Sequence, residues 1–169
     1  MPLPYNVPGL KVVLAQPTSL VCWATVFTMM YSWRRQVSVP IRQAVGDVDA
    51  RFARMFDDNH AIPPQDFIPF LSTARMTHEP MINLTIEGWE EKLRRHGLLW
   101  VGTMNTDYSG RHSRIVEGMQ GDGSTSGTSM KIIDPDGGRR YDETFAEFLR
   151  KYEAAFTAHD DIYYQIRHY

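Results

Sequence analysis

The stretch from Ser19 to Arg35 most constrains the fold, because nearly every position in it is apolar or small. A helix on the surface of a protein carries a polar face, whereas a helix that is apolar almost all round lies in the interior. We therefore expect a buried central helix. The chain of 169 residues has the length of one domain, which is enough to surround such a helix with a hydrophobic core.

The remainder of the first half also has helical spacing. Apolar residues recur at steps of three and four from Ile41 to Met55, which predicts one amphipathic helix. Pro63-Pro64 is expected to open a shorter helix, since proline suits the first helical turn. Thr85 can cap a further helix, which Gly97 would end.

The second half has the pattern of a sheet, with one late helix around Phe145 to Tyr152. We expect strands at Leu98–Met104, His112–Gln120, Met130–Ile133 and Ile162–Tyr169. Helices followed by antiparallel strands define the α+β class. We expect a single domain over residues 1–169, with a helical lobe over about 1–97 and a sheet lobe over about 98–169.

Charge and cysteine content exclude several classes of protein. Lys and Arg number 18 against 20 Asp and Glu, which gives no electrostatic footprint for nucleic acid or an anionic membrane. Cys22 is the only cysteine, which excludes an internal disulfide and a thiolate zinc cluster. No apolar run reaches the roughly 20 residues of a membrane helix, and the first residues do not read as a signal peptide. We therefore expect action in a cytoplasm, with any export following a route without a cleaved signal.

Cys22 stands at the start of the apolar stretch. Pro17 keeps the preceding residue extended, and Thr18 or Ser19 can cap the helix that follows. The free amides and macrodipole of a first helical turn favour a thiolate. A lone cysteine is more often a small buried core residue, but a cationic histidine beside it would make it a nucleophile.

The second half supplies a histidine and an acid. His112 begins one expected strand and Asp134 ends the next, so a hairpin through the Gly/Ser-rich residues 121–127 would bring them together. An aspartate on the far ring nitrogen would hold the imidazole in its tautomer and orientation. Gln16, six residues before Cys22, could donate its side-chain amide beside the Cys22 N–H, and these donors could hold an oxyanion.

These residues resemble the papain-like cysteine peptidases. The resemblance consists of Gln16 with Cys22-Trp23, a histidine strand carrying Val116 and Gly118, and Ile133-Asp134-Pro135. Chain length is similar to that of the small bacterial branches, which include bacteriocin-processing peptidases and delivered effectors or toxins. The larger relatives have Gly-Ser-Cys where Ser19-Leu20-Val21 stands here, and asparagine where Asp134 stands, which points away from papain itself.

The resemblance implies a papain-like fold and the roles of the four site residues. Cys22 is the nucleophile, His112 the base and acid, Asp134 the orienting group and Gln16 the oxyanion donor. The implied reaction is cleavage of a protein or peptide through an acyl-thioester, without a metal or organic cofactor. A monomer without nucleic-acid or membrane partners is expected, and a cognate inhibitor or immunity protein would block a toxin of this kind.

Two alternatives stay open. The same triad fits a glutamine deamidase or a cell-wall peptide amidase, and an α+β binding module without activity has the same overall pattern. The other histidines have no comparable sequence context, so surface or capping roles are expected for His60, His78, His96, His159 and His168.

Overall fold

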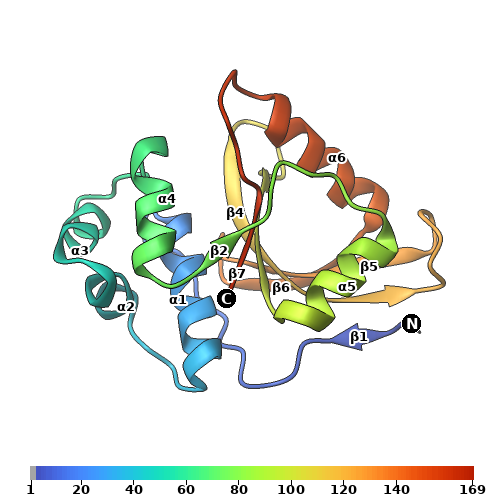
Figure 1. Ribbon diagram of the computed structural model, residues 1–169, viewed down its shortest axis with the longest axis horizontal. Helices are drawn as coiled ribbons and strands as arrows, with labels where there is room; N and C mark the ends of the chain where they lie inside the picture. Colours follow the sequence, from blue (N-terminus) through green and yellow to red (C-terminus); the bar gives the residue numbers. More distant parts are fainter. Residues whose placement is uncertain (1–2) are drawn as a thin grey trace.

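The apolar stretch forms helix α1, Cys22–Arg35, in the computed structural model, which describes residues 3–169 (Figure 1). Its residues from Trp23 to Met30 are all buried, which confirms the predicted central helix. The prediction that Thr18 or Ser19 caps this helix was wrong. The helix begins at Cys22, so the N-cap is Val21, whose side chain has no acceptor. Thr18 and Ser19 lie before the N-cap, in a loop whose carbonyl groups accept bonds from Gln16.

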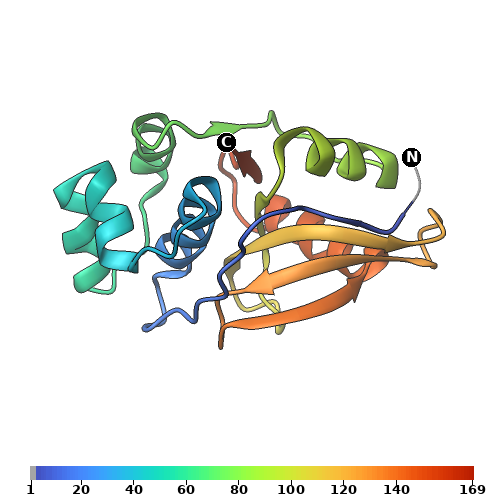
Figure 2. The ribbon, with the colours of Figure 1, turned by 90° about the horizontal axis from the view of Figure 1, so that it is seen from below.

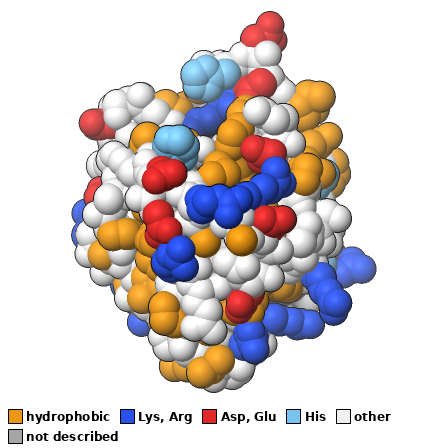
Figure 3. All heavy atoms as spheres, turned by 90° about the vertical axis from the view of Figure 1, so that its left-hand side faces the viewer, with side chains coloured by type: hydrophobic (Ala, Val, Ile, Leu, Met, Phe, Trp, Pro, Cys, Tyr) orange, Lys and Arg blue, Asp and Glu red, His pale blue; other side chains and the backbone are white. Residues whose placement is uncertain are grey.

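Three further helices pack beside α1: α2 (Ile41–Val48), α3 (Ala50–Asp57) and α4 (Pro64–Thr73). The single helix predicted for this region is interrupted at Asp49, whose backbone is extended and whose carboxylate accepts a bond of 2.8 Å from the Arg51 N–H. Asp49 therefore caps α3 instead of continuing α2. On the face that Figure 3 shows, acidic and basic side chains are interspersed.

The strands form one antiparallel sheet in the order β2-β7-β3-β4-β5-β6, with β1 paired to β4. Their bounds are Tyr5–Asn6 (β1), Thr77–His78 (β2), Leu99–Met104 (β3), Arg111–Gly121 (β4), Thr128–Asp134 (β5), Arg139–Thr144 (β6) and Ile166–His168 (β7). β3, β4 and β5 confirm the predicted strands. β1, β2 and β6 were not predicted, and β7 is shorter than expected.

The last two helices lie with the sheet. Helix α5 (Ile86–His96) is capped by Thr85, as predicted, and α6 is Phe145–Thr157. Trp89 of α5 packs edge-on against Phe148 of α6 at 5.1 Å, and both helices contact β3. Figure 2 shows both helices beside the strands of the sheet. α5 therefore lies with the sheet, although the sequence division at about residue 97 assigned it to the helical lobe. None of the helices within residues 3–169 is long and apolar enough to cross a membrane.

Candidate active site

Cys22 is the first residue of α1 and faces the sheet lobe across a cleft. Its neighbour Trp23 fixes this end of the helix: the indole Nε1 donates to the His60 main-chain oxygen at 3.0 Å, and the ring packs edge-on against Phe52 and Phe70. The first amides of a helix have no intrahelical acceptor. The thiol is thus held beside free N–H donors at the positive end of the helix.

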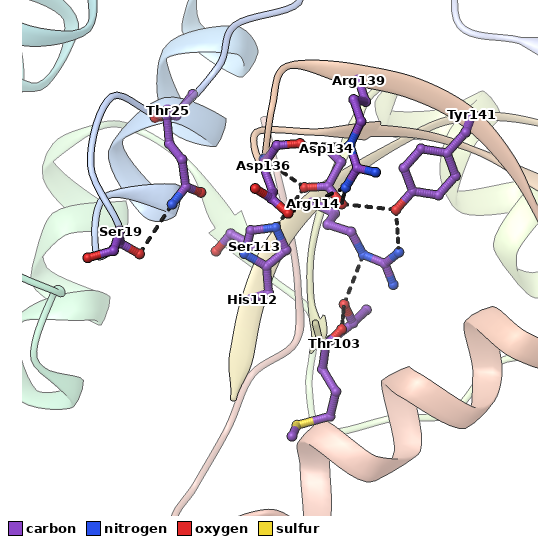
Figure 4. A network of polar contacts seen from close by, with 12 residues as sticks. Ser19, Thr25, Thr103, His112, Ser113, Arg114, Asp134, Asp136, Arg139 and Tyr141 are labelled. Atoms are coloured by element: carbon purple, nitrogen blue, oxygen red, sulfur yellow. Dashed lines mark hydrogen bonds and ion pairs between the residues drawn. The ribbon is translucent and has the colours of Figure 1, made fainter. Parts of the chain in front are cut away.

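The hairpin of β4 and β5 brings His112 and Asp134 together. Ile115 pairs with Ile133 in the antiparallel register, so the start of β4 lies beside the end of β5. His112 Nε2 lies 2.7 Å from Asp134 Oδ1, which confirms the expected contact (Figure 4).

Asp134 is held by two further donors. The Tyr141 hydroxyl donates to Oδ2 at 2.9 Å, and the Asp136 N–H donates to Oδ1 at 2.9 Å (Figure 4). Burial alone would raise the pKa of this carboxyl, but hydrogen bonding with His112 and the imidazolium charge, with these donors, hold the pKa below its ordinary value. Tyr141 was not expected at the site, because β6 was not predicted.

The imidazole and the thiol titrate as a pair. Because Nε2 of His112 faces Asp134, Nδ1 is the nitrogen left for Cys22. Burial works against the charged ring, yet hydrogen bonds with Asp134 and Cys22, with their negative charges, raise the pKa of His112 to about 9. Burial likewise works against the thiolate, but the hydrogen bond and charge of His112 lower the pKa of Cys22 below its ordinary value.

Ser113 is a further group at the sulfur that sequence reasoning missed. Its main-chain N–H and its hydroxyl both hydrogen-bond Cys22 and help to lower the thiol pKa. The Ser113 hydroxyl also accepts a bond of 2.9 Å from Nε1 of Trp100, which fixes its orientation. Its position directly after His112 in β4 was the one available signal.

Gln16 lies beside the site, tied to the hairpin by a bond of 2.8 Å from its main-chain N–H to the Pro135 oxygen. Its side-chain Nε2 donates to the oxygens of Thr18 at 3.0 Å and Ser19 at 3.2 Å. Both amide hydrogens are therefore directed at the loop that precedes α1. The predicted oxyanion role requires that one of these amide hydrogens leaves its acceptor in the loop. The bond to the Ser19 oxygen is the longer of the two.

Asn59 holds the same loop from the helical lobe. Its Oδ1 accepts from the Leu20 N–H at 2.9 Å, and its Nδ2 donates to the Ser19 hydroxyl at 3.3 Å. The residue has a positive φ of 53°, a conformation that asparagine tolerates better than most residues. The segment before Cys22 is therefore fixed from both lobes, by Asn59 and by the Gln16–Pro135 bond.

A pocket of about 410 Å³ opens at Cys22 and His112, between the two lobes. Its walls are mostly apolar and include Leu20, Ile62, Phe67, Ile68, Ile162 and Tyr164. Arg167 of β7 is the buried cation in the wall, with 2% of its surface exposed and its guanidinium 4.4 Å from the centre of the Phe67 ring. An apolar pocket beside a thiol and an imidazole can seat a substrate side chain next to a carbonyl group.

A helical lobe bearing a cysteine, packed against an antiparallel sheet bearing histidine and an acid, is the architecture of a papain-like cysteine peptidase. A comparison with protein families bears this out: the model described as papain-like cysteine protease AvrRpt2 matches residues 3–153. The chain belongs to this family and is a papain-like cysteine peptidase of the bacterial effector type. A search of curated proteins gave no significant match.

Proposed function

We propose that this peptidase cleaves protein substrates with Cys22 as nucleophile, His112 as base and acid, and Asp134 as the orienting group. The observation that supports the proposal most is the polar chain from Cys22 through His112 to Asp134. Its contacts raise the pKa of the imidazole to about 9 and lower the pKa of the thiol. Both shifts favour the pair of a thiolate and an imidazolium, the state that attacks a carbonyl group.

In the proposed reaction, Sγ of Cys22 forms a bond to the carbonyl carbon of the scissile amide, whose oxygen becomes an oxyanion. Nδ1 of His112 then gives its proton to the leaving nitrogen, the C–N bond breaks and an acyl-thioester remains. A water molecule attacks the thioester carbon while His112 accepts its proton. The C–S bond breaks, the carboxylic acid product is released, and the thiolate and the imidazolium are regenerated.

The oxyanion needs donors on the helix side of the cleft. The main-chain N–H of Cys22 is one, at the positive end of α1. Gln16 is the second in this proposal, and it supplies an amide hydrogen when Nε2 exchanges the longer bond to Ser19 for the substrate oxygen.

We further propose that the substrate is a protein inside a target cell, where an effector peptidase of this kind acts as a toxin. A producing cell then needs a cognate inhibitor that covers Cys22 and His112. Protease–inhibitor contacts typically bury about 1,600 Å² in total, so such an inhibitor would contact both lobes around the pocket.

The experiment compares new protein N-termini in a target-cell lysate treated with active protein or with Cys22→Ala. A small set of sites that appears only with active protein supports selective proteolysis. Conversion of a glutamine to glutamate without any new N-terminus would replace proteolysis with deamidation. Ser72→Ala, on the exposed face of α4, is the matched control and should behave as the unmodified protein.

Expression in a bacterial cytosol tests the toxin role separately. Growth arrest that disappears with Cys22→Ala supports it. Normal growth of cells that contain folded protein, with Cys22 still reactive toward a peptidyl epoxide, would contradict it.

A further inference from the structure

A second group of polar side chains lies outside the proposed active site, where β2, α5 and β7 meet. Glu79 follows β2, His96 is the last residue of α5 and His168 lies in β7, and one ligand atom of each lies within 4.8 Å of the others. We expected surface or capping roles for these histidines. For His168 this was wrong, because β7 lies between β2 and β3 in the sheet and only 4% of the residue is exposed.

The contacts of His168 define which nitrogen is available. Nδ1 lies 3.1 Å from the main-chain oxygen of Tyr169, an acceptor, so Nδ1 carries the proton of this hydrogen bond. In the neutral ring the lone pair is then on Nε2, which lies 2.7 Å from Oε1 of Glu79. A lone pair facing a carboxylate oxygen needs a positive centre between them, either a second proton or a metal ion. An Nδ1–H bonded to a main-chain oxygen is the outer contact usual for metal-binding histidines.

The other two side chains are arranged around the same point. Lys92 Nζ lies 2.8 Å from Oε2 of Glu79, which leaves Oε1 for another cation. His96 Nε2 lies 3.9 Å from Oε1, and its ring stacks on His168 with the centroids 3.6 Å apart and the planes at 21°. Stacked rings do not aim both lone pairs at one point, so His96 must turn. It stands at a helix end with 19% of its side chain exposed, which leaves room for that rotation.

We propose that Glu79, His96 and His168 bind one divalent cation of the zinc class. Two imidazole nitrogens and one carboxylate oxygen are an established zinc ligand set that leaves a fourth position for water. Zinc–ligand distances of about 2.0–2.2 Å require these atoms to move by on the order of 1 Å. The ion would join the short strand β7 to the end of α5 and to the segment after β2. Arg167, which lines the pocket, directly precedes His168 in this strand.

The test measures binding of ZnCl₂ by calorimetry to tag-free protein carrying Cys22→Ala, because a thiolate beside an imidazole is itself a zinc site. We expect one equivalent bound with a micromolar Kd and a thermal midpoint that rises with zinc. His168→Ala and His96→Gln should each weaken binding at least roughly tenfold, as loss of a ligand costs no less than loss of an outer partner. His159→Ala, at an exposed histidine outside the group, is the matched control and should bind normally.

Cobalt provides a second readout, since Co²⁺ in a four-coordinate site gives strong visible absorption that Glu79→Gln should reduce. His96→Gln changes a side chain at a helix end and keeps the test valid if His168→Ala does not fold. Absence of saturable binding, or binding that survives both histidine substitutions, would overturn the proposal. A proton alone would then join Glu79 and His168.

Discussion

At the scale of single residues, Ser113 offers the sharpest test of how the thiolate is held. Its hydroxyl is one of two Ser113 donors to Cys22, and Ser113→Ala removes it while the main-chain N–H stays. A hydrogen bond to a charged group contributes about 1.5–3 kcal/mol, so the thiol pKa should rise by roughly one unit. The acid limb of the iodoacetamide alkylation profile should therefore move to higher pH by about one unit, with Ser72→Ala as control. An unchanged alkylation profile would show that the hydroxyl does not act on the sulfur.

Asp134 gives the second test at this scale. Asp134→Asn keeps the shape of the side chain and removes the negative charge that helps to raise the pKa of His112. The alkaline limb of kcat/KM should therefore move below its position near pH 9, and kcat/KM at neutral pH should fall. An alkaline limb that stays in place would mean that the charge of Asp134 does not support the imidazolium.

At the scale of elements, Gly118 connects the N-terminal strand to the sheet. A β-carbon there would lie 2.4 Å from the main-chain oxygen of Tyr5, where β1 pairs with β4. Gly118→Ala must push β1 away, and overpacking of this kind costs about 1–3 kcal/mol of unfolding free energy. Gly110→Ala, at a glycine with open space around it, is the matched control. Equal urea midpoints for the two variants would contradict this account of the pairing.

The elements that could be predicted are those whose own side chains define them. α1 and strands β3 to β5 are apolar enough to be recognised without their neighbours. β6 has the sequence RRYDET, which is mostly polar because it lies at the sheet edge, and only the register with β5 reveals it as a strand. Asp49 was missed for a related reason. Apolar residues continue at helical spacing across it, so the sequence pattern does not show that Asp49 caps α3.

The residues of the candidate site likewise fall into those that the sequence predicts and those that it does not. Cys22, His112 and Asp134 could be proposed from the sequence because a helix start and one hairpin determine where they lie. Asn59 acts through a contact between segments far apart in the chain, 39 residues from Leu20, whereas Tyr141 is only seven residues from Asp134 but lies in β6, the strand that was not predicted. The Asn59 contact depends on how segments within the helical lobe pack together, which no local pattern records.

At the scale of the whole molecule, the proposed active site spans both lobes, with the thiol on α1 and its partners on the sheet. The reactive ion pair then exists only between two pKa values, the lowered pKa of Cys22 and the pKa of about 9 of His112. As pH rises, kcat/KM should increase through the first value and decrease through the second, because the leaving amine needs the imidazolium proton. Iodoacetamide alkylation should share the acid limb but persist above pH 9, since it needs no proton donor. Loss of both activities above pH 9 would point to unfolding instead.

The same pair should also make stability depend on pH. The pKa of His112 is raised from 6.5 to about 9 on folding. Protonation of His112 therefore contributes fully to the free energy of unfolding below pH 6.5, and this contribution is lost as pH rises through 9. Cys22→Ala removes the thiol, whose lowered pKa would offset this effect, and leaves Asp134 as the partner that raises the pKa of His112. The double variant Cys22→Ala/His112→Gln lacks the imidazole contribution at every pH, so the difference in unfolding free energy between these two variants, measured in urea, should shrink from pH 6 to pH 10. A constant difference would show that the imidazolium charge beside Asp134 does not stabilise the folded protein.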